Sequence, residues 1–308
     1  MRIQSALDSA GSQASAIEGL WWIFFWVAVA VYVSVVAALM IALFRKRRDS
    51  PSDKAAVKTV TIATAITVVT LFGLLISSIV VGREIAGMRQ GDVTIKVTGY
   101  RWWWDVEYQH PEKNKTFRTA NELYIPVGVP VRVELRTGDV IHSFWVPNLH
   151  GKQDLINGVP GVIFLKADKP GTWRGQCAEF CGQQHAKMAF WVTAVPQQEF
   201  ARWWQQQVQP SRIPATPDER KGQETFMSSP CPLCHSITGT DAAGKTAPDL
   251  THFASRRSIA AATLPNRREF LADWIVDSQH VKPGNNMPPV AMQSSDLNPL
   301  LAYLESLE

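Results

Sequence analysis

The sequence predicts a multi-domain protein in which a two-helix transmembrane hairpin precedes a β-sandwich or barrel and a small all-α domain. Two long apolar runs near the N-terminus predict the hairpin, and short alternating runs bounded by Gly and Pro from 93 to 195 predict the β domain. A Pro-rich stretch follows, and after it apolar residues recur at helical spacing. The predicted parts are a tail (1–19), the hairpin (20–82), the β domain (83–199), a linker (200–215) and the helical domain (216–308).

The two apolar runs, 20–44 and 59–81, contain no charged residue and are long enough to cross a bilayer. A buried core helix of a soluble protein is the alternative. The densest positive charge in the chain lies between the runs, at Arg45, Lys46, Arg47 and Arg48. The positive-inside rule therefore predicts that this loop is cytoplasmic and that both ends of the chain lie on the outer side.

Composition argues against nucleic acid as a partner. The formal net charge is only +4 over 308 residues, and no basic block interleaved with aromatic residues lies outside the loop between the apolar runs. The chain has four Cys, which form two tight pairs, Cys177 with Cys181 and Cys231 with Cys234. None is left over for a structural disulfide elsewhere.

The first Cys pair opens the stretch CAEFCGQQHAKM, which ends at Met188. Thiolate, imidazole and thioether all suit copper, whereas Met is not among the usual zinc ligands. Two Cys four residues apart can each bridge a pair of copper ions, so that one electron is shared over two metals. Such a pair needs a second imidazole, and His142 in DVIHSFWVPN is the strongest candidate. A Cys177–Cys181 disulfide is the alternative.

The second Cys pair lies in CPLCH, which ends at His235 and has the C-x-x-C-H pattern of c-type haem attachment. The two thiols bind the haem and the adjacent His ligates its iron. A Met as sixth ligand raises the reduction potential of such a haem. Met287 in KPGNNMPP is the predicted ligand, with Met292 and His280 as alternatives. A redox CxxC or half of a zinc site is the other reading of CPLCH.

The copper-motif segments resemble the copper-binding subunit II of haem-copper cytochrome c oxidases, and residues 216–308 resemble a class I cytochrome c. The resemblance implies a cupredoxin-like fold for the β domain. It also implies that Glu179 helps to bind a magnesium ion at the boundary with the catalytic subunit. The implied ligands of a dinuclear copper centre are His142, Cys177, Cys181, His185, Met188 and the backbone carbonyl of Glu179.

The stretch GYRWWWDVEY contains three consecutive Trp, which cannot all face one core if they lie on a strand. At least one is expected to be exposed. In the family, an aromatic cluster of this form lies over the copper centre, and alignment on Gly99 makes Trp102 the residue through which electrons enter. Aromatic packing is the alternative. Asp139 and Asp154 match the same family pattern, or are ordinary loop residues.

The whole chain resembles a bacterial cytochrome c oxidase subunit II with a fused cytochrome c domain, anchored twice in the inner membrane with both metal domains on the periplasmic side. An external donor, cytochrome c or quinol-cytochrome c reductase, would reduce the haem, and the copper would pass the electron to haem in subunit I. That subunit would reduce O2 to water and translocate protons, and subunit III is a further expected partner. The alternatives are the corresponding subunit of a copper-containing nitric oxide reductase and a copper-binding assembly protein.

The two soluble domains carry opposite net charge. Residues 83–210 contain 15 basic and 12 acidic residues, and residues 211–308 contain 9 and 11. The difference predicts weak, salt-dependent docking of the haem domain on the copper domain.

Overall fold

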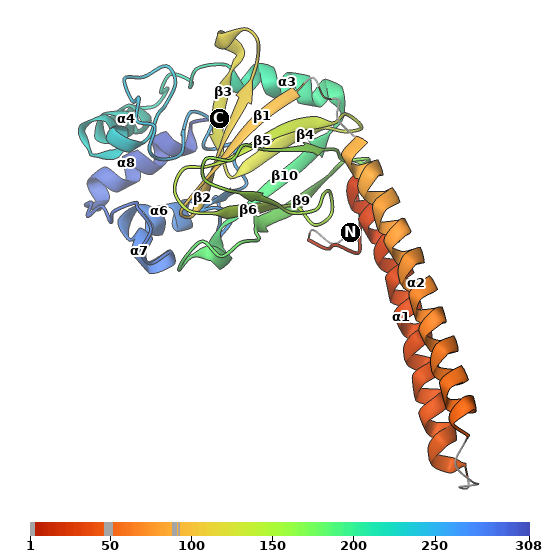
Figure 1. Ribbon diagram of the computed structural model, residues 1–308. Coiled ribbons are helices and arrows are strands. Elements are labelled where there is room, and N and C mark those ends of the chain that lie inside the picture. Colours follow the sequence, from red (N-terminus) through yellow and green to blue (C-terminus); the bar gives the residue numbers. More distant parts are fainter. Residues whose placement is uncertain (1–3, 46–51, 88–90, 92) are drawn as a thin grey trace. The chain divides into compact units, whose positions relative to one another are not determined.

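The computed structural model describes residues 4–45, 52–87, 91 and 93–308. It divides into two compact units (Figure 1). One is Gln13–Met88, and the other is the remainder, Met1–Ser12 with Arg89–Glu308. The second unit holds both soluble domains. Lys46, Arg47 and Arg48 of the predicted cytoplasmic loop lie outside the described residues.

The first unit is the predicted helical hairpin, made of α1 (Ser12–Phe44) and α2 (Asp53–Gly87). Both helices are long and apolar enough to cross a membrane, with mean hydropathies of 2.7 and 2.4 in their most apolar windows. Helix α1 begins at Ser12, so its first turns fall within the predicted tail. The hydroxyls of Thr59, Thr61 and Thr67 donate to carbonyls four residues earlier, which satisfies them inside α2.

A β-sandwich of two five-stranded sheets follows and confirms the predicted fold class. One sheet has the order β3-β2-β1-β5-β8 and the other β4-β10-β9-β6-β7. The strands are β1 (Val93–Tyr100), β2 (Trp103–Gln109), β3 (Phe117–Ala120), β4 (Glu122–Pro126), β5 (Val131–Thr137), β6 (His142–Trp145), β7 (Gln153–Leu155), β8 (Gly161–Leu165), β9 (Gly171–Cys177) and β10 (Ala189–Val195).

The alternation of side chains along each strand builds the core between the sheets. In β5, Val131, Val133 and Leu135 are fully buried while the residues between them are not. Trp104, Phe144 and Phe190, from β2, β6 and β10, pack in edge and stacked contacts 4.5–5.9 Å between ring centres. The sandwich therefore has a rigid aromatic core beneath the strand ends that carry His142 and Cys177.

Helix α3 (Gln197–Gln207) begins just before the predicted linker and packs on the sandwich. Its Trp203 and Trp204 contact the rings of Tyr108 and Phe117. The linker predicted from residue 200 therefore includes a helix that completes the β domain.

The C-terminal domain is helical, as predicted, with one pair of two-residue strands. Its elements are α4 (Pro217–Ser228), α5 (Cys231–Cys234), β11 (Ser258–Ile259), β12 (Leu264–Pro265), α6 (Arg268–Val276), α7 (Ser278–Val281) and α8 (Ser294–Glu305). A capping box between Thr216 and Glu219 starts α4. Gly222 lets α4 approach α8, because a Cβ at this position would lie 2.0 Å from the Pro299 carbonyl oxygen.

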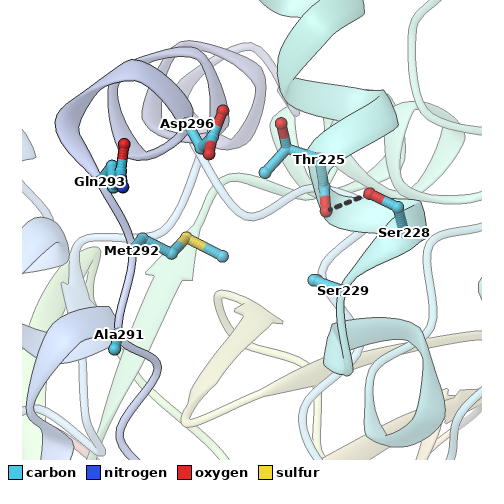
Figure 2. A pocket seen from close by; sticks show the side chains of 7 residues that line it. All are labelled: Thr225, Ser228, Ser229, Ala291, Met292, Gln293 and Asp296. Atoms are coloured by element: carbon cyan, nitrogen blue, oxygen red, sulfur yellow. Dashed lines mark hydrogen bonds between the residues drawn. The ribbon is translucent and has the colours of Figure 1, made fainter.

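An open pocket of about 480 Å³ lies between the end of α4 and the start of α8 (Figure 2). It is close in sequence to CPLCH, which begins two residues after Ser229. The lining residues are Thr225, Ser228, Ser229, Ala291, Met292, Gln293 and Asp296.

Candidate functional site

The ends of neighbouring strands bring the predicted copper ligands together. His142 begins β6 and Cys177 ends β9, and these strands pair with Phe144 opposite Cys177. The chain leaves the sheet at Cys177 and returns at Met188, where the Cys177 amide donates to the Met188 carbonyl at 2.9 Å. The ligand loop between them is thus closed at its base by the sheet itself.

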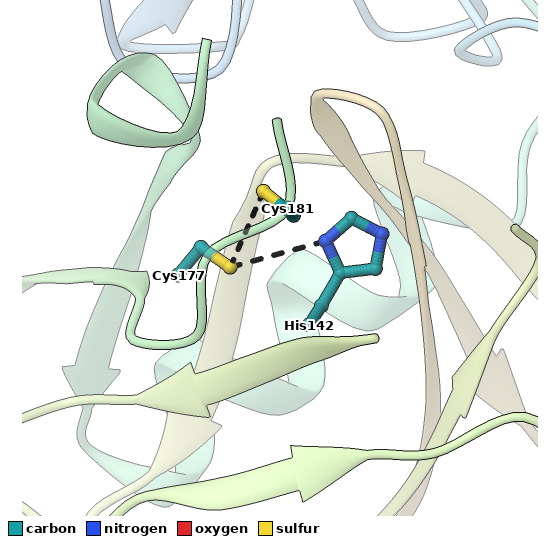
Figure 3. Close-up of side chains that lie close together, drawn as sticks. All are labelled: His142, Cys177 and Cys181. Atoms are coloured by element: carbon teal, nitrogen blue, oxygen red, sulfur yellow. Dashed lines mark hydrogen bonds between the residues drawn. The ribbon is translucent and has the colours of Figure 1, made fainter. Parts of the chain in front are cut away.

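Three buried ligand atoms lie at the centre of the site (Figure 3). The Sγ atoms of Cys177 and Cys181 are 3.7 Å apart, and Nδ1 of His142 is 3.8 Å from the Cys177 sulfur. A disulfide has an S–S distance of about 2.05 Å, so the two thiols are not bonded to each other. Both sulfurs are free to face a metal.

The remaining three predicted ligands surround the same two sulfurs. The Sγ atom of Cys181 lies 3.5 Å from Nδ1 of His185 and 3.8 Å from the Met188 sulfur. The carbonyl oxygen of Glu179 lies 3.2 Å from the Cys177 sulfur. The structure thus brings all six predicted donor groups into one cluster, with the sulfurs in the middle and two imidazoles, a thioether and a carbonyl around them.

Asp139 orients His142. The imidazole Nε2 lies 2.8 Å from the Asp139 carboxylate, which leaves Nδ1 directed at the sulfurs. Burial alone would raise the pKa of Asp139, but hydrogen bonds from His142 and from the amides of Arg101 and Val140 lower it below its usual range. The carboxylate is therefore ionised at neutral pH and suited to hold the imidazole N–H.

The two thiols share a proton. The hydrogen bond from Cys181 lowers the pKa of Cys177 to about 3, and the same contact raises the pKa of Cys181. One thiolate is therefore already present at neutral pH. A metal ion that takes both sulfurs as thiolates would have to displace only the second proton.

Trp102 lies in the turn between β1 and β2, so the three Trp do not occupy one strand as the alternation argument assumed. Its side chain is 8% exposed, and its Nε1–H donates to the Cys181 carbonyl at 3.0 Å. Trp104 is fully buried, while Trp103 is half-buried and stacks on Tyr100. The prediction that at least one of these Trp is exposed is therefore wrong: two are buried and Trp103 is half-buried.

CPLCH forms a single helical turn, α5, with its two thiols free and His235 immediately after it. The Nδ1 atom of His235 lies 2.7 Å from the Pro248 carbonyl oxygen. Donation of the Nδ1 proton to this carbonyl fixes the tautomer and leaves Nε2 free to bind a metal. Burial also lowers the pKa of His235, so the ring is kept in the neutral form that can bind a metal.

The three candidates for the sixth haem ligand differ in their surroundings. Met287 packs half-buried against the helical core, and its carbonyl accepts hydrogen bonds from Ser278 and Gln279 at 2.6 and 2.9 Å. His280 is exposed. Met292 lines the open pocket of Figure 2. Met287 thus combines a half-buried side chain with a main chain bonded on the carbonyl side, whereas His280 points to solvent.

Sequence reasoning missed the residues that join the two soluble domains. Lys282 of the haem domain reaches the Trp102 carbonyl, and Glu122 of the copper domain accepts from the Arg257 amide. A Lys in a Pro/Gly-rich loop and a Glu at a strand start are usually solvated. Nothing in the local sequence indicates that a second domain covers them.

These observations define a class of protein in which a cupredoxin-like domain with a cluster of soft ligands is joined to a cytochrome c domain. The family described as "Cytochrome C oxidase subunit II, periplasmic domain" matches residues 110–195, and "Cytochrome c" matches residues 219–308. A cytochrome c oxidase subunit 2 from Alkalihalophilus pseudofirmus is 35% identical over 318 residues, covering 99% of this chain and 91% of the relative. The chain belongs to the cytochrome c oxidase subunit 2 family.

Other relatives agree with this assignment. Cytochrome c oxidase subunit 2 of Bacillus subtilis is 30% identical over 70% of this chain and 62% of its own length. The solved periplasmic domain of subunit II of the Bradyrhizobium japonicum cytochrome oxidase is 34% identical, covers 38% of this chain and 94% of that chain, and aligns with a TM-score of 0.36. The Alkalihalophilus pseudofirmus and Bacillus subtilis relatives are both named as oxidase subunits, and neither is named as a nitric oxide reductase or a copper assembly protein.

Proposed function

We propose that this chain is the subunit through which electrons enter a terminal cytochrome c oxidase. Electrons pass from an external donor to a covalent haem c, then to a dinuclear copper centre, and then to haem in subunit I, which reduces O2 to water and translocates protons. The observation that carries the proposal is the cluster of six donor groups, in which two imidazoles, a thioether and a carbonyl surround the two Cys sulfurs at distances of 3.2–3.8 Å.

The donor set fits copper. Two thiolates, two imidazoles, one thioether and one carbonyl suit two copper ions that share both sulfurs, and Met disfavours zinc. When bound, such a pair accepts one electron spread over both ions. The chain's own contribution is a ligand loop closed by the sheet and an imidazole fixed by Asp139, which hold the ligands in place in both oxidation states.

The haem is attached through Cys231 and Cys234 and ligated by His235 and Met287. The Pro248 carbonyl holds His235 in the correct tautomer, and the hydrogen bonds to the Met287 carbonyl hold the opposite loop. A Met ligand places the haem at the higher potential that suits a respiratory donor.

Trp102 lies between the two centres in this proposal. Its side chain bonds the copper-ligand loop through Cys181, and its carbonyl accepts from Lys282 of the haem domain. Because the chain's own haem domain covers this Trp, an external donor reduces the haem and does not reach Trp102 directly.

Glu179 is the proposed magnesium ligand of this chain, with the remaining ligands supplied by subunit I. A carboxylate is a hard oxygen donor of the kind that magnesium prefers. Asp154 supports an ion nearby, because its buried Oδ1 has no hydrogen-bond partner within the described residues and its strand pairs with the one that carries His142.

Apolar surfaces of the chain support the proposed membrane location and the proposed partner, subunit I. Helices α1 and α2 anchor the chain twice in the bacterial inner membrane, with the metal domains on the periplasmic side and subunits I and III alongside. Phe180 at the tip of the ligand loop is 74% exposed, and Ile141 beside His142 is 45% exposed. Exposed apolar side chains around the copper-ligand loop support a docking face for subunit I at this loop.

The test is the copper and haem content of the purified full-length protein, with the electron paramagnetic resonance spectrum of its oxidised form. We expect two copper ions sharing one unpaired electron, beside one covalent haem. Cys181→Ser should abolish the shared signal and leave the haem unchanged. A single mononuclear copper in the wild type, or two coupled coppers in the Ser variant, would reject the dinuclear centre.

A further inference from the structure

Lys282 of the haem domain is buried at the copper domain, with 2% of its surface exposed. Its ammonium donates to three carbonyl oxygens, those of Trp102 at 2.7 Å, Lys187 at 2.9 Å and Ala260 at 3.2 Å. Burial lowers the pKa of Lys282 to about 7, while three acceptors match the three N–H groups of the charged form. Trp102 and Lys187 belong to the copper domain, so a buried charge spans the boundary.

The copper-ligand loop binds the same segment from its own side. The Gln184 amide donates to the Pro283 carbonyl at 2.9 Å, and the Lys187 ammonium donates to the Val281 carbonyl at 2.5 Å. The residues on either side of Lys282 are therefore held by the loop that carries His185 and Met188.

A left-handed turn of the haem domain contacts the end of the copper-ligand loop. Ala260, Ala261 and Ala262 have φ values of 52°, 56° and 56°, which are unfavourable for residues with a Cβ. The Ala261 carbonyl accepts from the Ala189 amide at 3.2 Å, one residue after Met188. A strained turn of this kind persists only where surrounding contacts hold it. Here those contacts include one with the copper domain.

A second contact fixes the orientation of the haem domain. The Glu122 carboxylate accepts from the amides of Arg257 and Ser258 at 2.8 and 3.1 Å. Beside it, the Trp191 indole donates to the Ser258 hydroxyl at 3.1 Å, and the Arg257 guanidinium lies 4.9 Å from the Trp191 ring centre. Two contacts at separate points prevent rotation about either one.

We propose that Lys282 is a positioning residue that locks the haem domain onto the copper-ligand loop in one orientation, so that electron transfer occurs within a fixed pair of domains. The effect on electron transfer rests on the function proposed above, whereas the lock itself does not. Buried, hydrogen-bonded contacts are little screened by salt. Transfer between the centres is therefore insensitive to ionic strength, unlike docking driven by the opposite net charges of the two domains.

The test compares Lys282→Met with Lys245→Met in the full-length protein. Both variants remove one positive charge from the same domain, but Lys245 is exposed, and Met replaces the Lys282 side chain as far as its Cε atom while lacking the ammonium group. Hydrogen exchange of the Ala189 amide reports the lock directly, because that amide bonds across the domain boundary. We expect exchange about tenfold faster in Lys282→Met, since bonds to a charged group are among the stronger ones, and no change in Lys245→Met.

Exchange at Arg257 and Ser258 separates a whole-domain effect from a local one. The lock predicts that these amides, at the second contact, also exchange faster in Lys282→Met. It further predicts that haem-to-copper transfer becomes slower and salt-dependent in this variant alone. Equal exchange in the two variants, or an effect confined to Ala189, overturns the proposal.

Lys187→Met provides a second variant that leaves no cavity, because the Lys187 side chain is exposed. It removes the bond to the Val281 carbonyl, and a smaller increase in Ala189 exchange is expected. An unchanged rate in this variant together with misfolding of Lys282→Met would reject the lock. Hydrogen exchange of these amides is measured without reference to copper or haem. If the copper assignment is wrong, the metal content and the spectrum show it separately.

Discussion

The indole N–H of Trp102 donates to the carbonyl oxygen of Cys181 at 3.0 Å. The carbonyl of the same Trp accepts from Lys282, five residues before Met287. One residue thus contacts a proposed copper ligand on one side and the proposed haem-ligand loop on the other.

Trp102→Phe should slow electron transfer from haem to copper by roughly three- to tenfold. An aromatic ring stays at this position, but the indole N–H that bonds the ligand loop is lost. Copper and haem content should stay unchanged. Time-resolved spectroscopy after rapid reduction of the haem measures the rate. Trp103→Phe is the matched control, since Trp103 stacks on Tyr100 at the surface of the same turn. Equal rates in the two variants would remove Trp102 from the route.

Asp139→Asn should weaken copper binding by about 10–100-fold, the usual effect of removing the partner of a ligating His. The neutral amide no longer favours the Nε2–H tautomer that points Nδ1 at the sulfurs. Competition with a copper chelator of known affinity measures the change. Asp168→Asn, at a distant carboxylate that contacts Ser12, should bind as the wild type does. Full affinity in Asp139→Asn would show that the sheet alone orients His142.

Met287→Leu should leave the haem attached but remove its sulfur ligand and lower its reduction potential. Leu has a similar volume, so the domain should still fold. Absorption spectra and a redox titration follow both effects. Met292→Leu, at the open pocket, should leave both unchanged. The opposite result would assign the iron ligand to Met292.

The folded state should lose stability at Glu122 as the pH rises from 4.5 to 7. Burial raises the pKa of this carboxyl to about 7, against the lowering effects of nearby Arg256 and of the hydrogen bonds from Ser258 and Arg257. The folded state therefore keeps a proton that the unfolded state has lost. The stabilisation is complete below pH 4.5 and is lost by about pH 7, a change of roughly 3 kcal/mol at most.

Hydrogen exchange at Ser258 across this pH range, corrected for intrinsic rates, measures the loss. Glu122→Gln should remove the slope, because an amide does not titrate. Lys282 does not interfere, because its pKa is lowered to about 7 and its effect, a gain in stability with rising pH, begins only there. A flat wild-type profile would mean that the pKa of Glu122 is not raised in the folded state.

The residues predicted as ligands lie close together in the structure because their spacing in the sequence is local. Five of the six predicted copper donors come from one twelve-residue stretch, and strand pairing places His142 beside it. Likewise, CPLCH carries both thiols and the proximal His on one helical turn. The two apolar runs predict the hairpin because length and lack of charge are sufficient for that conclusion.

The domain boundary could not be predicted in the same way. The position of Trp102 in a turn rather than on a strand depends on where the β1–β2 hairpin reverses. The burial of Lys282 and Glu122 depends on how two independently patterned domains meet, which no periodicity within either domain encodes. The sequence-based expectation of docking by net charge therefore overlooked specific buried bonds.

The three acceptors of the Lys282 ammonium are all main-chain carbonyls. Every residue type supplies such an oxygen, so in evolution the side chains at positions 102, 187 and 260 can change without removing an acceptor. The donor has no such freedom, because among the standard side chains only Lys offers three N–H groups on a single flexible nitrogen. The contact made by the Lys282 ammonium therefore depends on the identity of this one residue. Homologues that lose this Lys should be those in which the haem domain is mobile or absent.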